Sequence, residues 1–220
     1  MLTTLDYMKI FHETKNSVAL VNSSLQLIES KYPGVKDSSL WNDTMHEVTY
    51  LKNLITELSQ SRAGYPLKPV PVTPAAFLEE ISDSIRSLSF SQHFVCKTTL
   101  EDNLPPLQID TLRMKQAFIN LIKNSYEAMG ETGTVFLNVF RKDDFIWFDL
   151  IDFGGGIPEE IKDNIFEIFI SSKEYGTGLG LPIARQIIED HSGKLLLESR
   201  PGDGCTFSIL LPVGADGCQP

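Results

Sequence analysis

Hydrophobic residues recur at intervals of three, four and seven along the first part of the chain. Over residues 4–31 this spacing places apolar side chains on one side of a helix. The residues that carry the pattern are Phe11, Val18, Val21, Leu25 and Ile28. The run that follows contains Pro33 and Gly34. Because proline cannot continue a helix and glycine relieves the turn, the first helix is predicted to end near Lys31.

A second helix is predicted to begin at Ser38 or Ser39, either of which can cap its N-terminus. Its apolar positions keep the seven-residue rhythm and are Trp41, Val48, Leu51, Ile55 and Leu58. Two such helices form a hairpin with an apolar seam. Because a lone helix pair buries little surface, we expect two copies to form a dimeric four-helix bundle. Packing of the hairpin against the rest of the same chain is the alternative.

Four prolines between Pro66 and Pro74 mark the boundary of the hairpin. Proline-rich segments are extended and semi-rigid, so residues 65–74 are predicted to be a linker. It separates the helical hairpin at 1–64 from a second domain at 75–213. Residues 214–220 form a short tail.

Helical and strand-like patterns alternate in the second domain. Helices are predicted near 74–88, 110–129 and 181–191, a strand near 93–100, and strand hairpins at 134–151 and 194–211. This order predicts an α/β sandwich with helices on one face of a mixed sheet. The fold class of the whole chain is therefore α+β.

Charge and cysteine content exclude several classes of function. The net charge of -10 argues against nucleic acid as a partner, because such binding relies on dense Lys and Arg. Three cysteines are too few and too scattered for a disulfide framework or a zinc site, which favours a reducing cytoplasm. No run approaches the roughly 18 apolar residues of a membrane-spanning helix, and no signal peptide is visible. The chain could be a complete soluble protein or the cytoplasmic end of a longer one.

Two glycine-rich clusters are candidates for ligand binding. The first, Asp152 to Pro158, follows a predicted strand directly. A carboxylate at a strand end can accept a hydrogen bond from an exocyclic amine, and the glycines let a ligand ring approach the backbone. The second, Gly176 to Leu181, opens a helix whose free N–H groups suit phosphate oxygens. It matches neither a P-loop nor a Rossmann fingerprint. A third run, Gly202 to Gly204, is interpreted as a hairpin turn.

The helix at 110–129 has one polar and one apolar face. The polar stripe comprises Gln116, Asn120, Asn124 and Glu127, and the opposite stripe comprises Phe118, Leu121, Ile122 and Ser125. The apolar stripe is expected to pack on the sheet. A polar stripe is often just a solvated face, yet two asparagines four apart in a helix interior are unusual because asparagine has modest helix propensity.

Taken in order, these motifs resemble the ATP-binding domain of sensor histidine kinases. That domain belongs to the superfamily of DNA gyrase, the Hsp90 chaperones and the mismatch-repair ATPases, and the resemblance implies its Bergerat-type α/β sandwich. It covers about 74–212. The matching segments are the N box at 120–124, the first glycine box at 152–156, the phenylalanine box at 165–173, the second glycine box at 176–181 and the closing hairpin at 204–207 with 211–212.

The resemblance implies that the domain binds ATP with Mg²⁺. Asp152 would receive the adenine amine, Asn124 would be the metal ligand, and Lys173 would reach the terminal phosphates. Phe166 and Phe169 would anchor a lid over the nucleotide. The nucleotide-binding residues implied in this way are Asn120, Asn124, Asp152, Gly154, Gly156, Ile157, Phe169, Lys173, Gly176, Thr177, Gly178, Leu179, Gly180, Leu181 and Thr206.

The N box differs from that of the hydrolytic members of the superfamily. They carry a glutamate four residues before the metal-binding asparagine, where this chain has Asn120. An amide cannot act as a general base, so slow hydrolysis and transfer to another acceptor are predicted. A hydrolytic ATPase of the same superfamily remains an alternative. So does a non-kinase phosphotransferase or scaffold that has kept the fold.

The first helix supplies a candidate acceptor. Residues 11–16 resemble the phospho-acceptor box of the same kinases, His-Glu-x-x-Asn. The resemblance makes His12 the nucleophile, Glu13 the acceptor of a hydrogen bond from its other ring nitrogen, and Asn16 a group that could orient water for a phosphatase activity. The phosphoryl group would then pass to an aspartate of a response-regulator receiver domain.

The acceptor box departs from the family pattern at its end. Ser17 and Val18 replace the Pro-Leu that commonly follows it, so either the helix runs straighter or another device bends it. The other three histidines lack such a box and are interpreted as structural; they are His46, His93 and His191.

Overall fold

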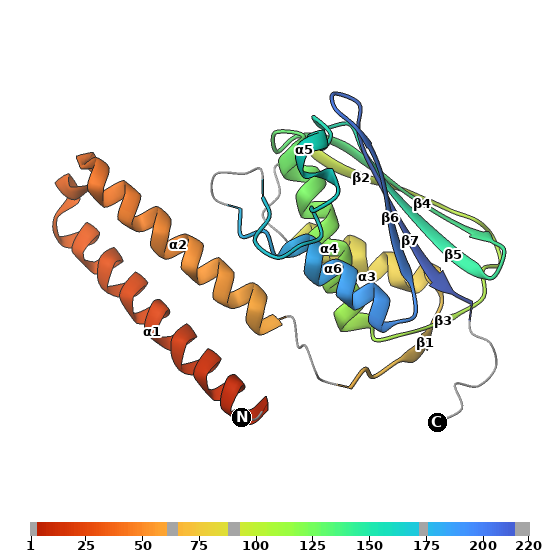
Figure 1. Cartoon of the computed structure of the whole chain (residues 1–220), viewed down its shortest axis with the longest axis horizontal. Helices are drawn as coiled ribbons and strands as arrows, with labels where there is room; N and C mark the ends of the chain where they lie inside the picture. The colour runs from red at the N-terminus through yellow and green to blue at the C-terminus, as the bar shows by residue number, and fades with distance from the viewer. Residues whose placement is uncertain (1–3, 61–65, 88–92, 172–175, 214–220) are drawn as a thin grey trace. The chain divides into compact units, whose positions relative to one another are not determined.

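The computed structural model describes residues 4–60, 66–87, 93–171 and 176–213 (Figure 1). The chain divides into two compact units. One comprises Met1–Pro66 with Glu167–Leu179, and the other comprises Leu67–Phe166 with Gly180–Pro220.

The first unit is built on a helical hairpin. Helix α1 spans Thr4–Lys31, a short 3₁₀ helix η1 spans Pro33–Asp37, and α2 spans Ser39–Gln60. The predicted bounds of α1 and the predicted start of α2 are confirmed. Helix α1 runs without interruption past the acceptor box. The Ser17 hydroxyl donates to the Glu13 carbonyl oxygen at 2.9 Å, a side-chain bond to the preceding turn that serine can make and proline cannot.

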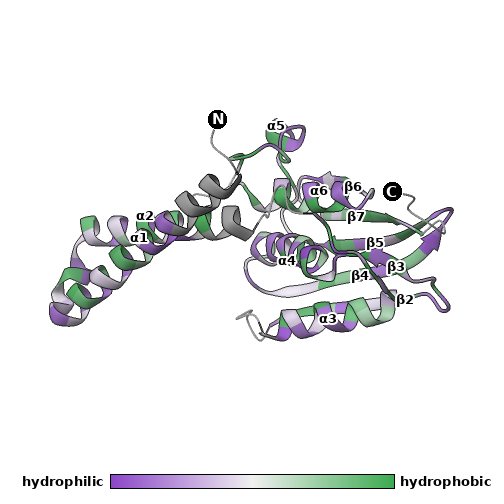
Figure 2. Cartoon of the chain, turned by 90° about the horizontal axis from the view of Figure 1, so that it is seen from below, coloured by the Kyte–Doolittle hydropathy of each residue, from purple (hydrophilic) through white to green (hydrophobic). Residues whose placement is uncertain are grey.

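The hairpin buries only part of its apolar surface. Val48 and Ile55 are buried in the seam, whereas Leu20 and Leu27 are each 69% exposed and Leu40 is 74% exposed. Figure 2 shows hydrophobic residues distributed along both helices. Within the described part of the chain, none of the helices has the length and apolar character needed to cross a membrane.

The second unit is a five-stranded sheet with helices on one face (Figure 1). Its strands, in spatial order, are β2 (Phe94–Leu100), β4 (Gly133–Lys142), β5 (Phe145–Asp152), β7 (Gly204–Pro212) and β6 (Lys194–Arg200). Strands β2 and β4 are parallel and the other pairs are antiparallel. The helices are α3 (Pro74–Ser87), α4 (Thr111–Ala128), the single turn α5 (Glu159–Lys162) and α6 (Gly180–Asp190). The predicted α/β sandwich with a mixed sheet is confirmed.

A second, two-stranded sheet was not predicted. Strand β1 (Val70–Val72) lies inside the proline-rich stretch and pairs antiparallel with β3 (Leu107–Ile109). The backbone N–H of Lys68 also donates to Asp110 Oδ2 at 3.2 Å. Proline is tolerated in a strand whose N–H faces outward. The partner strand is remote in the chain, so the local proline content indicated only a connector.

The core forms where α4 lies on the sheet. The predicted apolar stripe is confirmed, because Phe118, Leu121 and Ile122 are fully buried. Phe118 meets the rings of Phe77 and Phe148 edge to face, with both centroid distances at 5.3 Å. Such aromatic contacts add to the stabilisation from apolar burial. They hold α4 against the central strand that carries Asp152.

The first turn of α4 is tied to the end of α6. Asp110 caps α4 by accepting from the Arg113 N–H at 3.2 Å, and its own N–H donates to His191 Nε2 at 2.9 Å. His191 Nδ1 lies 2.7 Å from the Ile187 carbonyl oxygen and donates to it. This pattern requires a neutral ring. Burial is the main reason that the pKa of His191 is lowered, and the nearby Arg113 lowers it further. The structure thus supports a structural role for this histidine.

Candidate nucleotide-binding site

Asp152 ends the central strand β5 on the face covered by α4. Strand residues alternate between faces, and Asp152 follows Phe148 and Leu150 on the buried side. The residue is 2% exposed. Oδ2 accepts from the Ser125 hydroxyl at 2.9 Å, while Oδ1 accepts from the N–H groups of Gly154 at 3.0 Å and Cys205 at 3.3 Å.

With these three donors bound, the Asp152 carboxylate can still accept a further hydrogen bond. Each carboxylate oxygen can accept about two hydrogen bonds. Oδ1 accepts two, whereas Oδ2 accepts one from the described residues. A buried acceptor is costly to leave unpaired, and a fixed one is selective for its donor. The geometry suits an exocyclic amine at Oδ2.

The first glycine box is shaped by its neighbours in the protein. Gly156 has φ of 69°, and a Cβ there would collide with the carbonyl oxygen of Arg200. A Cβ on Gly154 would lie 2.8 Å from the Ala128 carbonyl oxygen. Close packing of α4 and the β6–β7 hairpin against the loop therefore requires both glycines. The approach of a ligand ring to them stays a prediction.

The polar stripe of α4 is not simply a solvated face. Asn120 donates through Nδ2 to the Gly180 carbonyl oxygen at 3.2 Å, so the N box holds the end of the second glycine box. Asn124 lies one turn further along and is half-buried. A Cβ on Gly180 would meet its nearest atom, in Asn120, at 3.9 Å. Unlike Gly156, Gly180 therefore has room for a Cβ in ordinary van der Waals contact with Asn120.

The segment 167–179 carries the rest of the predicted lid. The Phe169 N–H donates to the Gly178 carbonyl oxygen at 3.1 Å, and both residues have positive φ. A Cβ on Gly178 would lie 2.6 Å from the Phe169 carbonyl carbon. The glycine is thus required by a close turn within the segment. Lys173 lies outside the described residues.

The two phenylalanines predicted to anchor the lid differ in their surroundings. Phe166 is half-buried, with the Arg185 guanidinium 5.2 Å from its ring centroid. Phe169 is 58% exposed. It has a positive φ, and the chain turns back there towards Gly178. Its role as a lid anchor stays a prediction.

The structure separates Thr206 from the other predicted nucleotide-binding residues. In the register of β5 and β7, Asp152 is opposite Cys205 and Ile151 is opposite Thr206. Directly opposed side chains share a face of the sheet. Thr206 therefore lies on the face away from the Asp152 carboxylate. Cys205 takes the neighbouring position, and its contribution is a backbone N–H rather than a side chain.

Two further residues of this site were missed at the level of sequence. Ser125 was assigned to the packing stripe of α4, although a hydroxyl on an apolar face is a signal that it has a buried partner. Ser199 follows no motif that sequence analysis had singled out. It is buried, and its hydroxyl accepts from the Ile157 N–H at 2.9 Å. Both contacts depend on strand and helix packing that local patterns do not specify.

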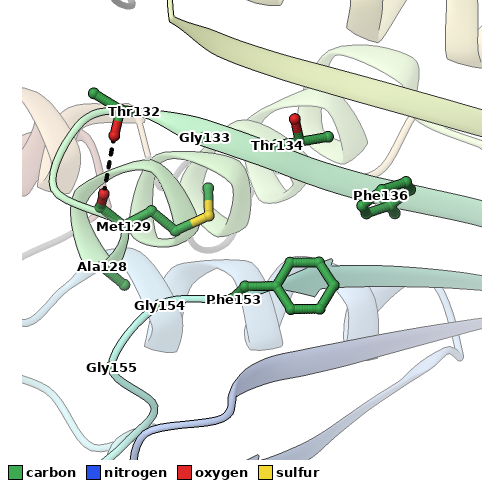
Figure 3. Close-up of a pocket in the computed structure, with 9 residues that line it drawn as sticks. All are labelled: Ala128, Met129, Thr132, Gly133, Thr134, Phe136, Phe153, Gly154 and Gly155. Carbon is green, nitrogen blue, oxygen red and sulfur yellow. Dashed lines mark hydrogen bonds between the residues drawn. The ribbon is translucent and has the colours of Figure 1, made fainter.

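A pocket of about 430 Å³ lies beside the first glycine box (Figure 3). Figure 3 shows the side chains of Met129, Phe136 and Phe153 around it, and the two rings are 5.9 Å apart between centroids. The complete lining is Ala128, Met129, Thr132, Gly133, Thr134, Phe136, Phe153, Gly154 and Gly155. This lining includes neither the Asp152 carboxylate nor a charged side chain. The pocket is therefore distinct from the acceptor that suits an amine.

Comparison with known proteins agrees with this geometry. Residues 109–215 match the family described as histidine kinase-, DNA gyrase B- and HSP90-like ATPases. A solved catalytic domain of the histidine kinase ThkA is 33% identical, with a TM-score of 0.54 over 66% of this chain and 96% of that one. The chain belongs to the sensor histidine kinases. Full-length ShkA in complex with AMPPNP shares the fold, with a TM-score of 0.74 over 99% of this chain and 47% of that one at 19% identity.

Curated relatives extend the family relationship to nearly the whole chain. Sporulation kinase C of Bacillus subtilis is 32% identical over 213 residues, which are 94% of this chain and 48% of the relative. The sensory histidine kinase/phosphatase NtrB of Rhodobacter capsulatus is 33% identical over 215 residues, which are 92% of this chain and 60% of the relative. This histidine kinase chain thus spans between about half and three-fifths of the length of these two relatives.

The residues of this histidine kinase chain fit a purine nucleotide with Mg²⁺. The open acceptor position on Asp152 Oδ2 matches the amine of adenine. Mg²⁺ prefers oxygen ligands and keeps several waters, so one side-chain amide such as that of Asn124 is a sufficient protein ligand. The N-terminus of α6 at Gly180 is the positive end of a helix dipole, which suits phosphate oxygens. Among the described residues, there is no group of three or more His, Cys, Asp or Glu that could hold a metal without the nucleotide.

The acceptor box lies on α1. His12 belongs to this helix, but its side chain is outside the described residues. Glu13 and Asn16 are both exposed. Residues four apart on a helix lie one above the other, so Asn16 shares the face of His12.

Proposed function

We propose that this chain binds Mg·ATP, transfers the γ-phosphoryl group to His12 and then passes it to an aspartate of a response-regulator receiver domain. The observation that carries the proposal is the Asp152 carboxylate. It is buried and fixed by Ser125, Gly154 and Cys205, and one acceptor position remains for the adenine amine. Membership of the sensor histidine kinase family supports the same activity.

The N box would organise the phosphates. The side-chain oxygen of Asn124 would hold Mg²⁺, which would neutralise charge on the phosphate oxygens when bound. Asn120 donates to the Gly180 carbonyl and so keeps the start of α6 next to the N box. The backbone N–H groups at this helix terminus, together with the side chain of Lys173, would bind the terminal phosphates.

Transfer to histidine is favoured over hydrolysis by the residue at position 120. A general base must accept a proton from water, and the Asn120 amide cannot do so. In the transfer, an imidazole nitrogen of His12 forms a bond to the γ-phosphorus as the bond to the β–γ bridging oxygen breaks. ADP leaves with the electron pair of that bond. Glu13 would accept a hydrogen bond from the other ring nitrogen and stabilise the positive charge that develops.

The hairpin would act as a homodimer. Leu20 and Leu27 are seven residues apart and both largely exposed, as is Leu40 on α2. Exposed apolar residues in a regular row are typical of a helical interface. A second copy of the hairpin would cover them in a four-helix bundle.

The phosphotransfer proposal is tested with ATP labelled at its γ-phosphate. The wild-type chain with Mg²⁺ is expected to acquire acid-labile, base-stable label, which is typical of phosphohistidine. His12→Gln should acquire none, whereas His46→Gln, the same change at an exposed histidine on the other helix of the hairpin, should label normally. Label that persists in His12→Gln would contradict the proposal. Steady phosphate release that is unaffected by His12→Gln would indicate a hydrolytic ATPase instead.

A phosphatase activity is proposed for the same helix. Asn16 is exposed one turn after His12, where its amide would orient water against a phosphorylated aspartate. The R. capsulatus relative is named a kinase/phosphatase, which supports this. Asn16→Ala should retain label on His12 and lose ADP-stimulated dephosphorylation of a phosphorylated receiver domain. Equal dephosphorylation by the variant and the wild type would contradict the role of Asn16.

A further inference from the structure

The Ser199 hydroxyl makes all of its hydrogen bonds to groups within the protein. Ser199 lies near the end of β6 and is 8% exposed. Its oxygen accepts from the Ile157 N–H at 2.9 Å and from the Cys205 thiol at 3.2 Å, and it donates to the Gly204 carbonyl oxygen at 3.1 Å. A hydroxyl has one proton to donate and two lone pairs to accept with. Each of these is engaged.

These contacts join two segments that form the surroundings of Asp152. Ile157 follows the first glycine box, whereas Gly204 and Cys205 begin β7. The same two segments also meet where the Gly202 N–H donates to the Gly155 carbonyl oxygen at 2.9 Å. The Lys162 ammonium of α5 donates to the Ser199 carbonyl oxygen at 3.0 Å. Ser199 is thus the point at which the glycine box, the closing hairpin and α5 meet.

The Ser199 hydroxyl also controls the placement of a donor to Asp152. Cys205 donates its backbone N–H to Asp152 Oδ1 at 3.3 Å, while its thiol and the preceding carbonyl both bond to Ser199. Burial is the main cause of the raised pKa of Cys205, so the thiol stays protonated and able to donate. A bond of 3.3 Å is near the upper limit for an N–H donor. A small displacement of Cys205 would therefore weaken it.

We propose that Ser199 is a positioning residue for base recognition, because it holds the glycine box and the Cys205 N–H in the places that orient the Asp152 carboxylate. This inference rests on the proposed binding of ATP. It assigns Ser199 no contact with the nucleotide. The hydroxyl acts through Asp152, whose Oδ2 must face the adenine amine to accept from it.

Removal of the hydroxyl should affect the base more than the phosphates. Ser199→Ala leaves the Ile157 N–H and the Gly204 carbonyl without this partner, and the Asp152 carboxylate loses one of its constraints. The affinity for ADP is expected to fall about tenfold, which corresponds to one buried hydrogen bond. Inosine diphosphate has a carbonyl oxygen in place of the amine and so cannot donate to Asp152 Oδ2 from that position. Its affinity should change by less than about threefold, because its phosphate contacts are unaltered.

The test is calorimetric titration of ADP and inosine diphosphate, each with Mg²⁺, into the full chain. The readout is the ratio of the two dissociation constants, which a change in stability alone would not move. Ser208→Ala is the matched control, since Ser208 is on β7 opposite Asp149 and faces away from Asp152. Ser208→Ala should keep the wild-type ratio of the two dissociation constants. Ser199→Ala should bring the two dissociation constants closer together.

Two results would overturn the inference. One is an unchanged ratio because Ser199→Ala weakens both nucleotides equally, and the other is a ratio that changes because the affinity for inosine diphosphate falls more than that for ADP. If the alanine variant does not fold, Ser199→Cys is measured in its place, because a thiol remains a weak donor and acceptor. Its ratio should lie between those of the wild type and of an Asp152→Asn variant, and a wild-type ratio would overturn the inference. Failure of the wild-type chain to bind ADP would instead overturn the proposed function.

Discussion

The Ser125 hydroxyl donates to Asp152 Oδ2 at 2.9 Å, and this bond joins the N-box helix to the end of the central strand. Both groups are almost completely buried. The bond orients the carboxylate without using all of its acceptor capacity. It brings together a helix and a strand whose relevant residues are 27 positions apart, and it defines which part of Asp152 remains for a ligand.

Asp152→Asn is expected to weaken ADP binding about ten- to hundredfold, because hydrogen bonds to a charged acceptor contribute about 1.5–3 kcal/mol. The amide can keep the bonds from Gly154 and Cys205 at its oxygen. Its nitrogen, however, would stand at the position of Oδ2 and could only donate, whereas the adenine amine needs an acceptor there. Titration calorimetry with Mg·ADP measures the change. Asp144→Asn, an exposed turn residue between β4 and β5, is the control, and equal affinities in the two variants would contradict this role of Asp152.

Adjacent glycines in the first glycine box should respond differently to substitution. Gly156→Ala should lower the free energy of unfolding by about 2 to 4 kcal/mol, because its Cβ would collide with the Arg200 carbonyl at a positive φ. Gly155→Ala meets nothing within 4 Å and should change stability by no more than about 0.5 kcal/mol. Urea denaturation followed by circular dichroism compares the two. A larger loss of unfolding free energy in Gly155→Ala than in Gly156→Ala would show that the loop has another conformation.

The buried histidine at the end of α6 should make stability depend on pH. The pKa of His191 is lowered from its ordinary value of 6.5, so the unfolded chain takes up this proton first as the pH falls. The contribution of His191 to the free energy of unfolding is fully present above a pH of about 6.5. It is lost as the pH falls from there towards the pKa of His191 in the folded chain. Denaturation midpoints between pH 8 and pH 5 measure this. His191→Gln should have a flatter profile than the wild type, whereas His93→Gln, at an exposed histidine, should retain the wild-type slope.

The exposed leucines of the hairpin should control association. The double substitution Leu20→Lys with Leu27→Lys is expected to raise the dimer dissociation constant at least about a hundredfold, since each buried leucine contributes about 1.5–3 kcal/mol. Light scattering across a concentration series provides the measurement. Leu112→Lys alters a leucine of α4 that is 58% exposed and should leave association unchanged. A wild-type chain that is monomeric at micromolar concentration would refute the dimer.

Most elements of the fold could be predicted because their signals are local. The two hairpin helices, α4 and the β4–β5 hairpin repeat apolar residues with the period of a helix or a strand. Strand β1 could not be predicted in this way. Its three residues acquire their structure from β3, and the intervening α3 and β2 carry no sign of that pairing.

The same difference between local signals and tertiary contacts applies to single residues of the candidate site. The glycine boxes and the N box indicated the family, because the order of motifs along the chain can be seen in the sequence directly. The reasons for individual residues differed from those expected. Gly156 is required by the Arg200 carbonyl, and Thr206 faces away from Asp152. Each of these depends on strand register, and a shift of one residue exchanges the two faces of a strand.

The sequence by itself determined that this chain is a helical hairpin followed by an ATP-binding domain of the histidine kinase type. It did so because periodicity and motif order are properties of neighbouring residues. Only the tertiary structure decided that Ser125, Cys205 and Ser199 surround or support Asp152. These residues come from α4, β7 and β6. The hydrogen bonds of about 3 Å that join Ser125 and Cys205 to Asp152, and Cys205 to Ser199, exist only after the helix has packed on the sheet and the strands have paired in register.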